Sequence, residues 1–90
     1  MYQVRMEPYE DAKVQYQQLN FTWFFANKPT IQDLINRLQI EREDADGREF
    51  EIEHLIEILT ETDMYEFAGY SKVYCVFGEI YISQVKVTEN

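Results

Sequence analysis

Two side chains in this sequence could serve as a nucleophile or a general base, and each type occurs once. They are His54, the one histidine, and Cys75, the one cysteine. His54 stands between Glu53 and Glu57, whose charges would hold the imidazole proton and make it a poor base. Cys75 falls on the apolar side of a predicted strand, where a buried thiol is unreactive. The sequence also has no Ser-His-Asp pattern and no glycine-rich phosphate loop. We therefore predict that the protein is not an enzyme and uses no cofactor, although acid pairs alone can do acid–base chemistry.

Calcium binding is the second chemistry that the residues suggest. If Gly47 is the glycine at position 6 of an EF-hand loop, three acids take the ligand positions 3, 5 and 12, namely Asp44, Asp46 and Glu53. Position 1 then falls on Arg42, which places a cation where the first ligand belongs. We predict no metal site here. A calcium-binding or enzymatic domain remains the third alternative.

Negative charge is concentrated in residues 41–66. This stretch holds eleven acids and two arginines, so its net charge of −9 equals that of the whole chain. Four of the acids are spaced four residues apart and would form one row along a helix: Glu49, Glu53, Glu57 and Glu61. Like charges at this spacing cost about 0.2–0.5 kcal/mol per pair, and no Lys or Arg interrupts the row. A local sequence feature that disfavours folding often marks a functional site.

A line of carboxylates can imitate the phosphates of a nucleic acid and occupy a groove lined with Arg and Lys. The partner is then a protein with a basic nucleic-acid-binding groove. Direct binding of nucleic acid or of an anionic membrane is disfavoured by the charge. The simpler alternative is that the acids form the solvated face of an amphipathic helix. The predicted partner-binding residues are Glu41, Glu43, Asp44, Asp46, Glu49, Glu53, Glu57, Glu61 and Asp63.

Hydrophobic periodicity predicts one domain of the α+β class over residues 1–90. Alternating apolar residues predict strands over 2–6, 13–26, 72–77 and 80–88, the second of them bent by a bulge or turn at Gln17 and Gln18. Two stripes of helical spacing lie between them, over residues 31–38 and 52–59. The order is ββααββ, and an antiparallel sheet of about four strands would carry both helices on one face.

The first helix has a start signal, and the second has a competing interpretation. Thr30 and Asp33 resemble a capping box with Asp in place of Glu, and this helix should end between residues 39 and 42. Residues 38–40 and 50–52 also alternate, so Asp46 and Gly47 could instead turn a hairpin between them. We prefer two helices because each stripe continues for two turns.

The last two predicted strands form a hairpin. Gly78 and Glu79 fit a two-residue type II′ turn, which would pair Phe77 with Ile80 and Cys75 with Ile82. A bulge at Ser83 and Gln84 would bring Val85 and Val87 onto the same face.

The opposite face of the sheet would carry aromatic and apolar side chains: Phe24, Tyr74, Val76 and Tyr81. This face is either covered by the loop over residues 63–71 or exposed as a dimer or partner surface. A protein–protein adaptor or small homodimer that uses this face is the second alternative for function.

In size, acidity and lack of catalytic residues, the chain resembles the small phage proteins that block host defence, such as anti-CRISPR and anti-restriction inhibitors. The resemblance implies a stoichiometric inhibitor that acts in the cytoplasm of a host cell. A single cysteine allows no internal disulfide, which fits a reducing compartment. The first seven residues contain no apolar segment typical of a secretory signal, and no apolar run approaches the roughly 20 residues that span a membrane.

Overall fold

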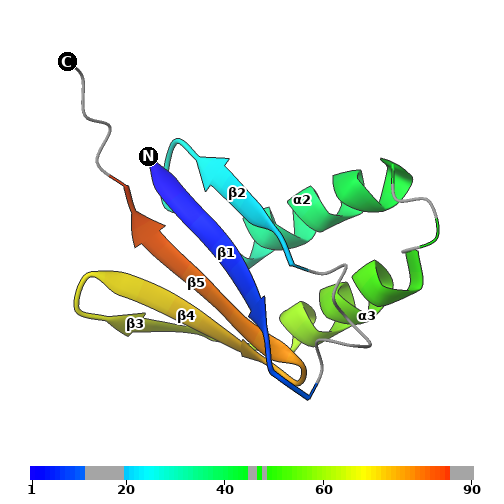
Figure 1. Ribbon diagram of the computed structural model, residues 1–90. Helices are drawn as coiled ribbons and strands as arrows, with labels where there is room; N and C mark the ends of the chain where they lie inside the picture. The colour runs from blue at the N-terminus through cyan, green and yellow to red at the C-terminus, as the bar shows by residue number, and fades with distance from the viewer. Residues whose placement is uncertain (12–19, 45–46, 48, 86–90) are drawn as a thin grey trace.

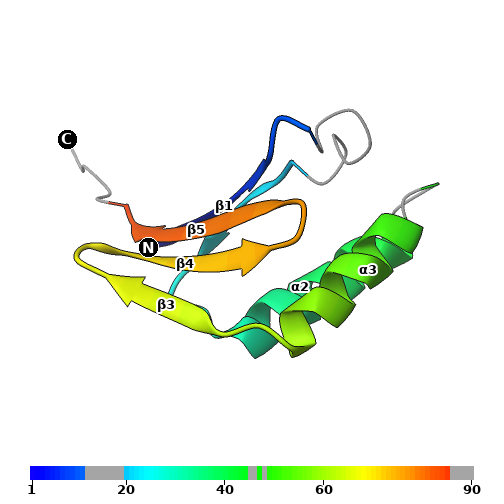
Figure 2. The same ribbon diagram turned by 90° about the horizontal axis from the view of Figure 1, so that it is seen from below.

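The protein combines a sheet with a pair of helices. The computed structural model describes residues 1–11, 20–44, 47 and 49–85. The elements are β1 (Tyr2–Pro8), β2 (Thr22–Phe25), α2 (Ile31–Asp44), α3 (Glu49–Thr60), β3 (Met64–Phe67), β4 (Tyr70–Cys75) and β5 (Gly78–Gln84). The strands form one antiparallel sheet in the order β2-β1-β5-β4-β3. Both helices lie on one face of it (Figures 1 and 2). The predicted α+β class and antiparallel sheet are confirmed.

The sheet has five strands, so the prediction of about four strands in ββααββ order was one strand short. The additional strand is β3, in a segment that we expected to be a loop. It pairs with β4 from Met64 opposite Val73 to Phe67 opposite Tyr70. Gly69, in the turn between them, has φ of 88°, a conformation that glycine adopts without steric cost. A strand of four residues is too short to show its period clearly, and its pairing depends on β4.

Of the predicted long strand over residues 13–26, the structure describes residues 20–26. Within the described residues of this segment, β2 covers Thr22–Phe25. The expected bulge at Gln17 and Gln18 lies outside the described residues. At the other end of the chain, β5 ends at Gln84, and Val87 is likewise outside them.

The two-helix prediction is confirmed, and the hairpin alternative is wrong. The capping box is present, because the Asp33 amide donates to Thr30 Oγ1 at 3.2 Å and the Thr30 amide donates to Asp33 Oδ2 at 2.9 Å. Helix α2 then runs to Asp44, beyond its expected end. The apolar stripes face the sheet and bury Leu34, Ile35 and Leu38 from α2 with Ile52, Leu55 and Leu59 from α3. A hairpin would have buried only alternate residues.

The core lies between the helices and the inner face of the sheet. Its sheet side consists of the alternate residues of the three central strands and Trp23 of β2, and its helix side consists of the two apolar stripes. The side chains that are almost completely buried are Val4, Met6, Leu34, Leu38, Leu55, Leu59, Val73, Ile80 and Ile82. Ile40 and Phe50 are the exceptions among the large apolar residues of the helices, because both are exposed. Most acids of the two helices also lie on the solvent side, whereas Glu51 has one carboxylate oxygen buried.

The turn between β4 and β5 lies two residues earlier than predicted. Cys75 pairs with Gly78 and Val73 with Ile80, so the turn is formed by residues 76 and 77. A shift by an even number of residues keeps every side chain on its face, and Cys75 and Ile80 remain in the core. Gly78 serves a different purpose from the one expected. A Cβ atom there would lie 2.6 Å from the Glu7 carbonyl oxygen of β1, so only glycine fits between the strands.

The predicted bulge at Ser83 and Gln84 is absent from the pairing of β5 with β1. Gln3 pairs with Ser83 and Tyr2 with Gln84, in unbroken register with the rest of the strand. The ladder continues with a hydrogen bond from the Val85 amide to the Met1 carbonyl at 2.9 Å.

Candidate functional site

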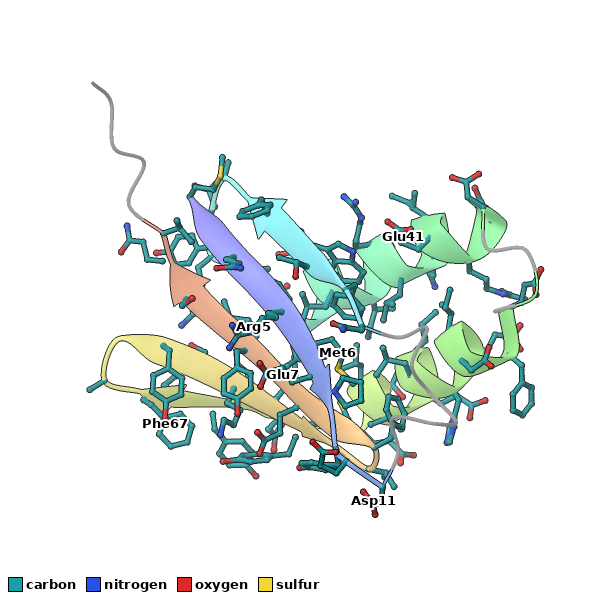
Figure 3. All side chains as sticks on the ribbon, viewed as in Figure 1. Arg5, Met6, Glu7, Asp11, Glu41 and Phe67 are labelled. Carbon is teal, nitrogen blue, oxygen red and sulfur yellow. The ribbon has the colours of Figure 1, made fainter. Side chains whose placement is uncertain are left out.

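Most of the predicted partner-binding acids lie on the solvent side of the two helices. We use the name acidic helical surface for the exposed acids of this layer, which are Glu43 and Asp44 at the end of α2, Glu49 and Glu57 on α3, and Glu61 and Asp63 just after it. Asp46 lies outside the described residues. Figure 3 shows Glu41 on this helical layer, away from Arg5 and Glu7 on the sheet.

Two of the predicted acids are held in ion pairs and are half-buried. Arg37 Nη2 lies 3.1 Å from Glu41 Oε1, one helical turn along α2. Arg42 of α2 forms an ion pair with Glu53 of α3. The row of acids on α3 is therefore relieved at Glu53 by a cation from the neighbouring helix, which the spacing along one helix could not show. Within the described ranges, Glu49, Glu57 and Glu61 make no ion pair.

Glu66, the last acid of the charged stretch, belongs to a different part of the molecule. It lies on β3, where its carboxylate accepts hydrogen bonds from Lys28 Nζ at 2.5 and 2.6 Å and from Ser71 Oγ at 2.7 Å. These hydrogen bonds, that of Lys28 first, lower the pKa of Glu66. The group ties β3 to the segment before α2, so Glu66 has a structural role and does not extend the acidic helical surface.

The possible catalytic side chains are set in the interior or at its edge. Cys75 is 6% exposed, and burial raises the pKa of its thiol to about 11, which keeps it neutral and unreactive at pH 7. The half-buried His54 ring packs at 6.0 Å from the Phe77 ring. Among the residues that the structure describes, no three His, Cys, Asp or Glu side chains gather as metal ligands would. No described helix is long and apolar enough to cross a membrane.

The side of the sheet opposite the helices is a second candidate surface. We call it the outer sheet face, and it is made of the residues that alternate with the core residues of each strand. The predicted positions of Phe24, Tyr74 and Tyr81 on this face are confirmed by the register. Val76 instead lies in the turn after β4, where it is 81% exposed. The face comprises Gln3, Arg5, Glu7, Thr22, Phe24, Tyr65, Phe67, Tyr70, Lys72, Tyr74, Glu79, Tyr81 and Ser83.

Five of the six aromatic side chains of this face are exposed, and Tyr81 is half-buried. Phe24 is 55% exposed, Tyr65 51%, and Phe67, Tyr70 and Tyr74 about 40% each. We expected the loop over residues 63–71 either to cover these rings or to leave them exposed. This segment forms β3 and its turn, and it extends the sheet sideways (Figure 2). No part of the described chain packs over this side of the sheet. Sequence reasoning missed Tyr65, Phe67 and Tyr70 because it took their segment to be a loop.

The charged residues of the outer sheet face neutralise one another. Arg5 lies 3.2 Å from Glu7, and Lys72 lies 3.5 Å from Glu79. Tyr81, between the two cations, has the Arg5 guanidinium 5.5 Å and Lys72 Nζ 4.7 Å from its ring centroid. Its hydroxyl donates to Glu79 Oε2 at 2.5 Å, and this hydrogen bond, together with burial, raises the pKa of Tyr81. Glu7 and Glu79 lie directly opposite each other in the ladder of β1 and β5. Their pairing with cations removes a repulsion that would weaken this strand pairing.

No protein family matches this chain, and comparisons with curated proteins and with solved structures find no match. The described residues present two surfaces, one strongly acidic and one aromatic with balanced charges.

Proposed function

We propose that the protein is a small acidic inhibitor whose helical layer occupies the nucleic-acid-binding groove of another protein, as anti-CRISPR and anti-restriction inhibitors do. The observation that supports this is the exposure of Glu49 and Glu57 on α3 and of Glu61 just after it, with no ion pair within the described residues. The proposal places the protein's action in the cytoplasm of a host cell.

The dimensions of the acidic helical surface suit this role. Glu49 and Glu61 are twelve residues apart, which is roughly 18 Å along a helix. One strand of DNA presents about five phosphates over that length. Glu43 and Asp44, at the end of α2, extend the charge beyond the first turn of α3. A groove built to hold a phosphate backbone would therefore find carboxylates along a comparable line.

The electrostatics also support association with a basic partner. The remaining chain outside residues 41–66 is balanced in charge, with six acids and six bases, so the negative potential is directed from one layer. Such a field accelerates the approach of a positively charged partner and releases the counterions of both surfaces on binding. Binding should therefore weaken steeply as salt is added.

Capture from a bacterial lysate tests the proposal. Heparin-binding proteins from the lysate are offered to the immobilised chain at low and at high salt, with duplex DNA as competitor. The wild type should retain a nucleic-acid-binding protein that both DNA and salt displace. Glu57→Lys with Glu61→Lys should lose at least about tenfold in affinity, since two phosphate-like contacts become repulsive.

A matched control is available on the other side of the molecule. Glu10→Lys with Asp11→Lys changes the net charge by the same amount, in the turn after β1 and away from the helical layer (Figure 3 labels Asp11). This control should bind like the wild type. If both double variants bind equally well, or if salt has no effect, the proposal is wrong.

A further inference from the structure

We propose that the outer sheet face is the interface of a homodimer, in which two copies of the chain pack sheet against sheet. This goes beyond the proposed inhibitor function and uses the opposite side of the molecule. The sheet carries helices on one face, and no described segment covers the other (Figure 2). Six aromatic residues stand on that uncovered face, and five of them are at least 40% exposed. Five of the six lie together on β3, β4 and β5, and Phe24 stands apart on β2 beyond the polar side chains of β1. Exposed patches of this kind often mark interaction sites.

The balanced charge of the outer sheet face suits a second copy as its occupant. Two copies each carry a net charge of −9 and repel one another over most orientations. The outer sheet face is an exception, because its four charged residues form two internal ion pairs, Arg5 with Glu7 and Lys72 with Glu79. Packing these faces together also places the two acidic helical surfaces on the far sides of the dimer, where their repulsion is smallest.

The rings of the face are already arranged for contact. Phe67 and Tyr70 stack with centroids 5.0 Å apart, and Tyr65 meets Tyr74 edge to face at 5.5 Å. Tyr81 is held by Glu79 and lies beside Lys72. Tyr, Phe and Arg are the residue types that protein interfaces favour. Side chains that are held in place before association lose less entropy when they are buried.

The size of the face suits a weak dimer. Strands about 4.8 Å apart that rise about 3.3 Å per residue make a five-stranded face of about 24 by 18 Å. Two such faces bury about 900 Å² before the relief of the side chains is counted, which is near the lower end for specific interfaces. We therefore expect a dissociation constant of about 1–100 μM.

Sedimentation equilibrium over a range of protein concentrations tests this inference. The wild type should change from the mass of one chain to that of two, and added salt should leave the dimer intact. Tyr74→Glu places a charge on the face and should weaken the dimer at least about tenfold. Val76→Glu adds the same charge at a more exposed residue in the adjacent turn and should have no effect.

Circular dichroism establishes that each variant is folded. If Tyr74→Glu does not fold, Phe24→Glu provides the same test, because Phe24 is 55% exposed on the edge strand β2. A wild type that stays monomeric at all concentrations would overturn the inference. A dimer that Val76→Glu disrupts as strongly as Tyr74→Glu does would also overturn it. So would a change in mass that occurs only when a single-stranded oligothymidylate is added, because the rings would then bind bases in place of a second copy. None of these outcomes bears on the inhibitor function, which the lysate experiment tests with different variants.

Discussion

Arg42, in the last turn of α2, forms an ion pair with Glu53 in the second turn of α3 and so links the two helices across their connection. Each side chain is about half exposed, so the pair stabilises the protein only slightly. Its larger effect is on the acidic row, because it places one cation against the acid that lies between Glu49 and Glu57.

Replacing this cation should weaken the fold through repulsion. We expect Arg42→Gln to lower the free energy of unfolding by up to about 1 kcal/mol at low salt and by less at high salt, since salt screens the exposed acids. Urea denaturation at two ionic strengths measures this. Glu53→Gln removes a charge from the row and should cost less than Arg42→Gln. An Arg42→Gln variant whose stability loss is the same at both ionic strengths would contradict the electrostatic explanation.

Gly78 should be the least replaceable glycine in the described chain. The Cβ of Gly78→Ala would lie 2.6 Å from the Glu7 carbonyl oxygen and 2.9 Å from Pro8 Cα, and both are backbone atoms that move only if β1 moves. We expect a loss of about 3 kcal/mol in the free energy of unfolding, measured by urea denaturation.

Gly69→Ala is the control for this substitution. Gly69 has no neighbouring atom within 4 Å of the added Cβ, so its cost comes only from the φ of 88°. This cost is about 1 kcal/mol. Equal losses for the two variants would show that the close approach of β1 to β5 is not what requires Gly78.

Cys75 should make stability depend on pH in the alkaline range. Burial raises the pKa of its thiol from 9.0 to about 11, so the unfolded chain loses this proton first. Between these two values the unfolded state binds fewer protons than the folded state, and the free energy of unfolding falls as the pH rises. The stabilisation is complete below pH 9 and is lost toward pH 11.

Comparison with Cys75→Ala isolates the thiol from the tyrosines and lysines that titrate in the same range. From pH 7 to pH 10, the wild type should lose about 1–2 kcal/mol more than Cys75→Ala. Urea denaturation of both proteins at the two pH values provides the measurement. Parallel loss in the two proteins would mean that the folded and unfolded thiols titrate alike.

Local patterns in the sequence were sufficient for the helices and for the faces of most strands. The capping box of Thr30 and Asp33 and the two apolar stripes act within one or two turns, so their outcome does not depend on distant residues. Alternation likewise assigned Phe24, Tyr74 and Tyr81 to the outer sheet face, because successive side chains of a strand point to opposite sides. The acidic character of the helical layer follows from the same patterns.

Contacts between distant segments decided the rest. β3 is a strand only because β4 pairs with it, and this pairing brings Tyr65 and Phe67 onto the outer sheet face. The turn before Gly78 is placed by the packing of β5 against β1, which no pattern within the hairpin reveals. Arg42 and Glu53 come from different helices, and Glu66 is paired with a lysine 38 residues away. The sequence by itself thus determined the two helices, the faces of most strands and the negative charge of the helical layer, since periodicity and charge are local. Only the tertiary structure decided which acids are neutralised and which rings stand together, since those depend on how the elements pack.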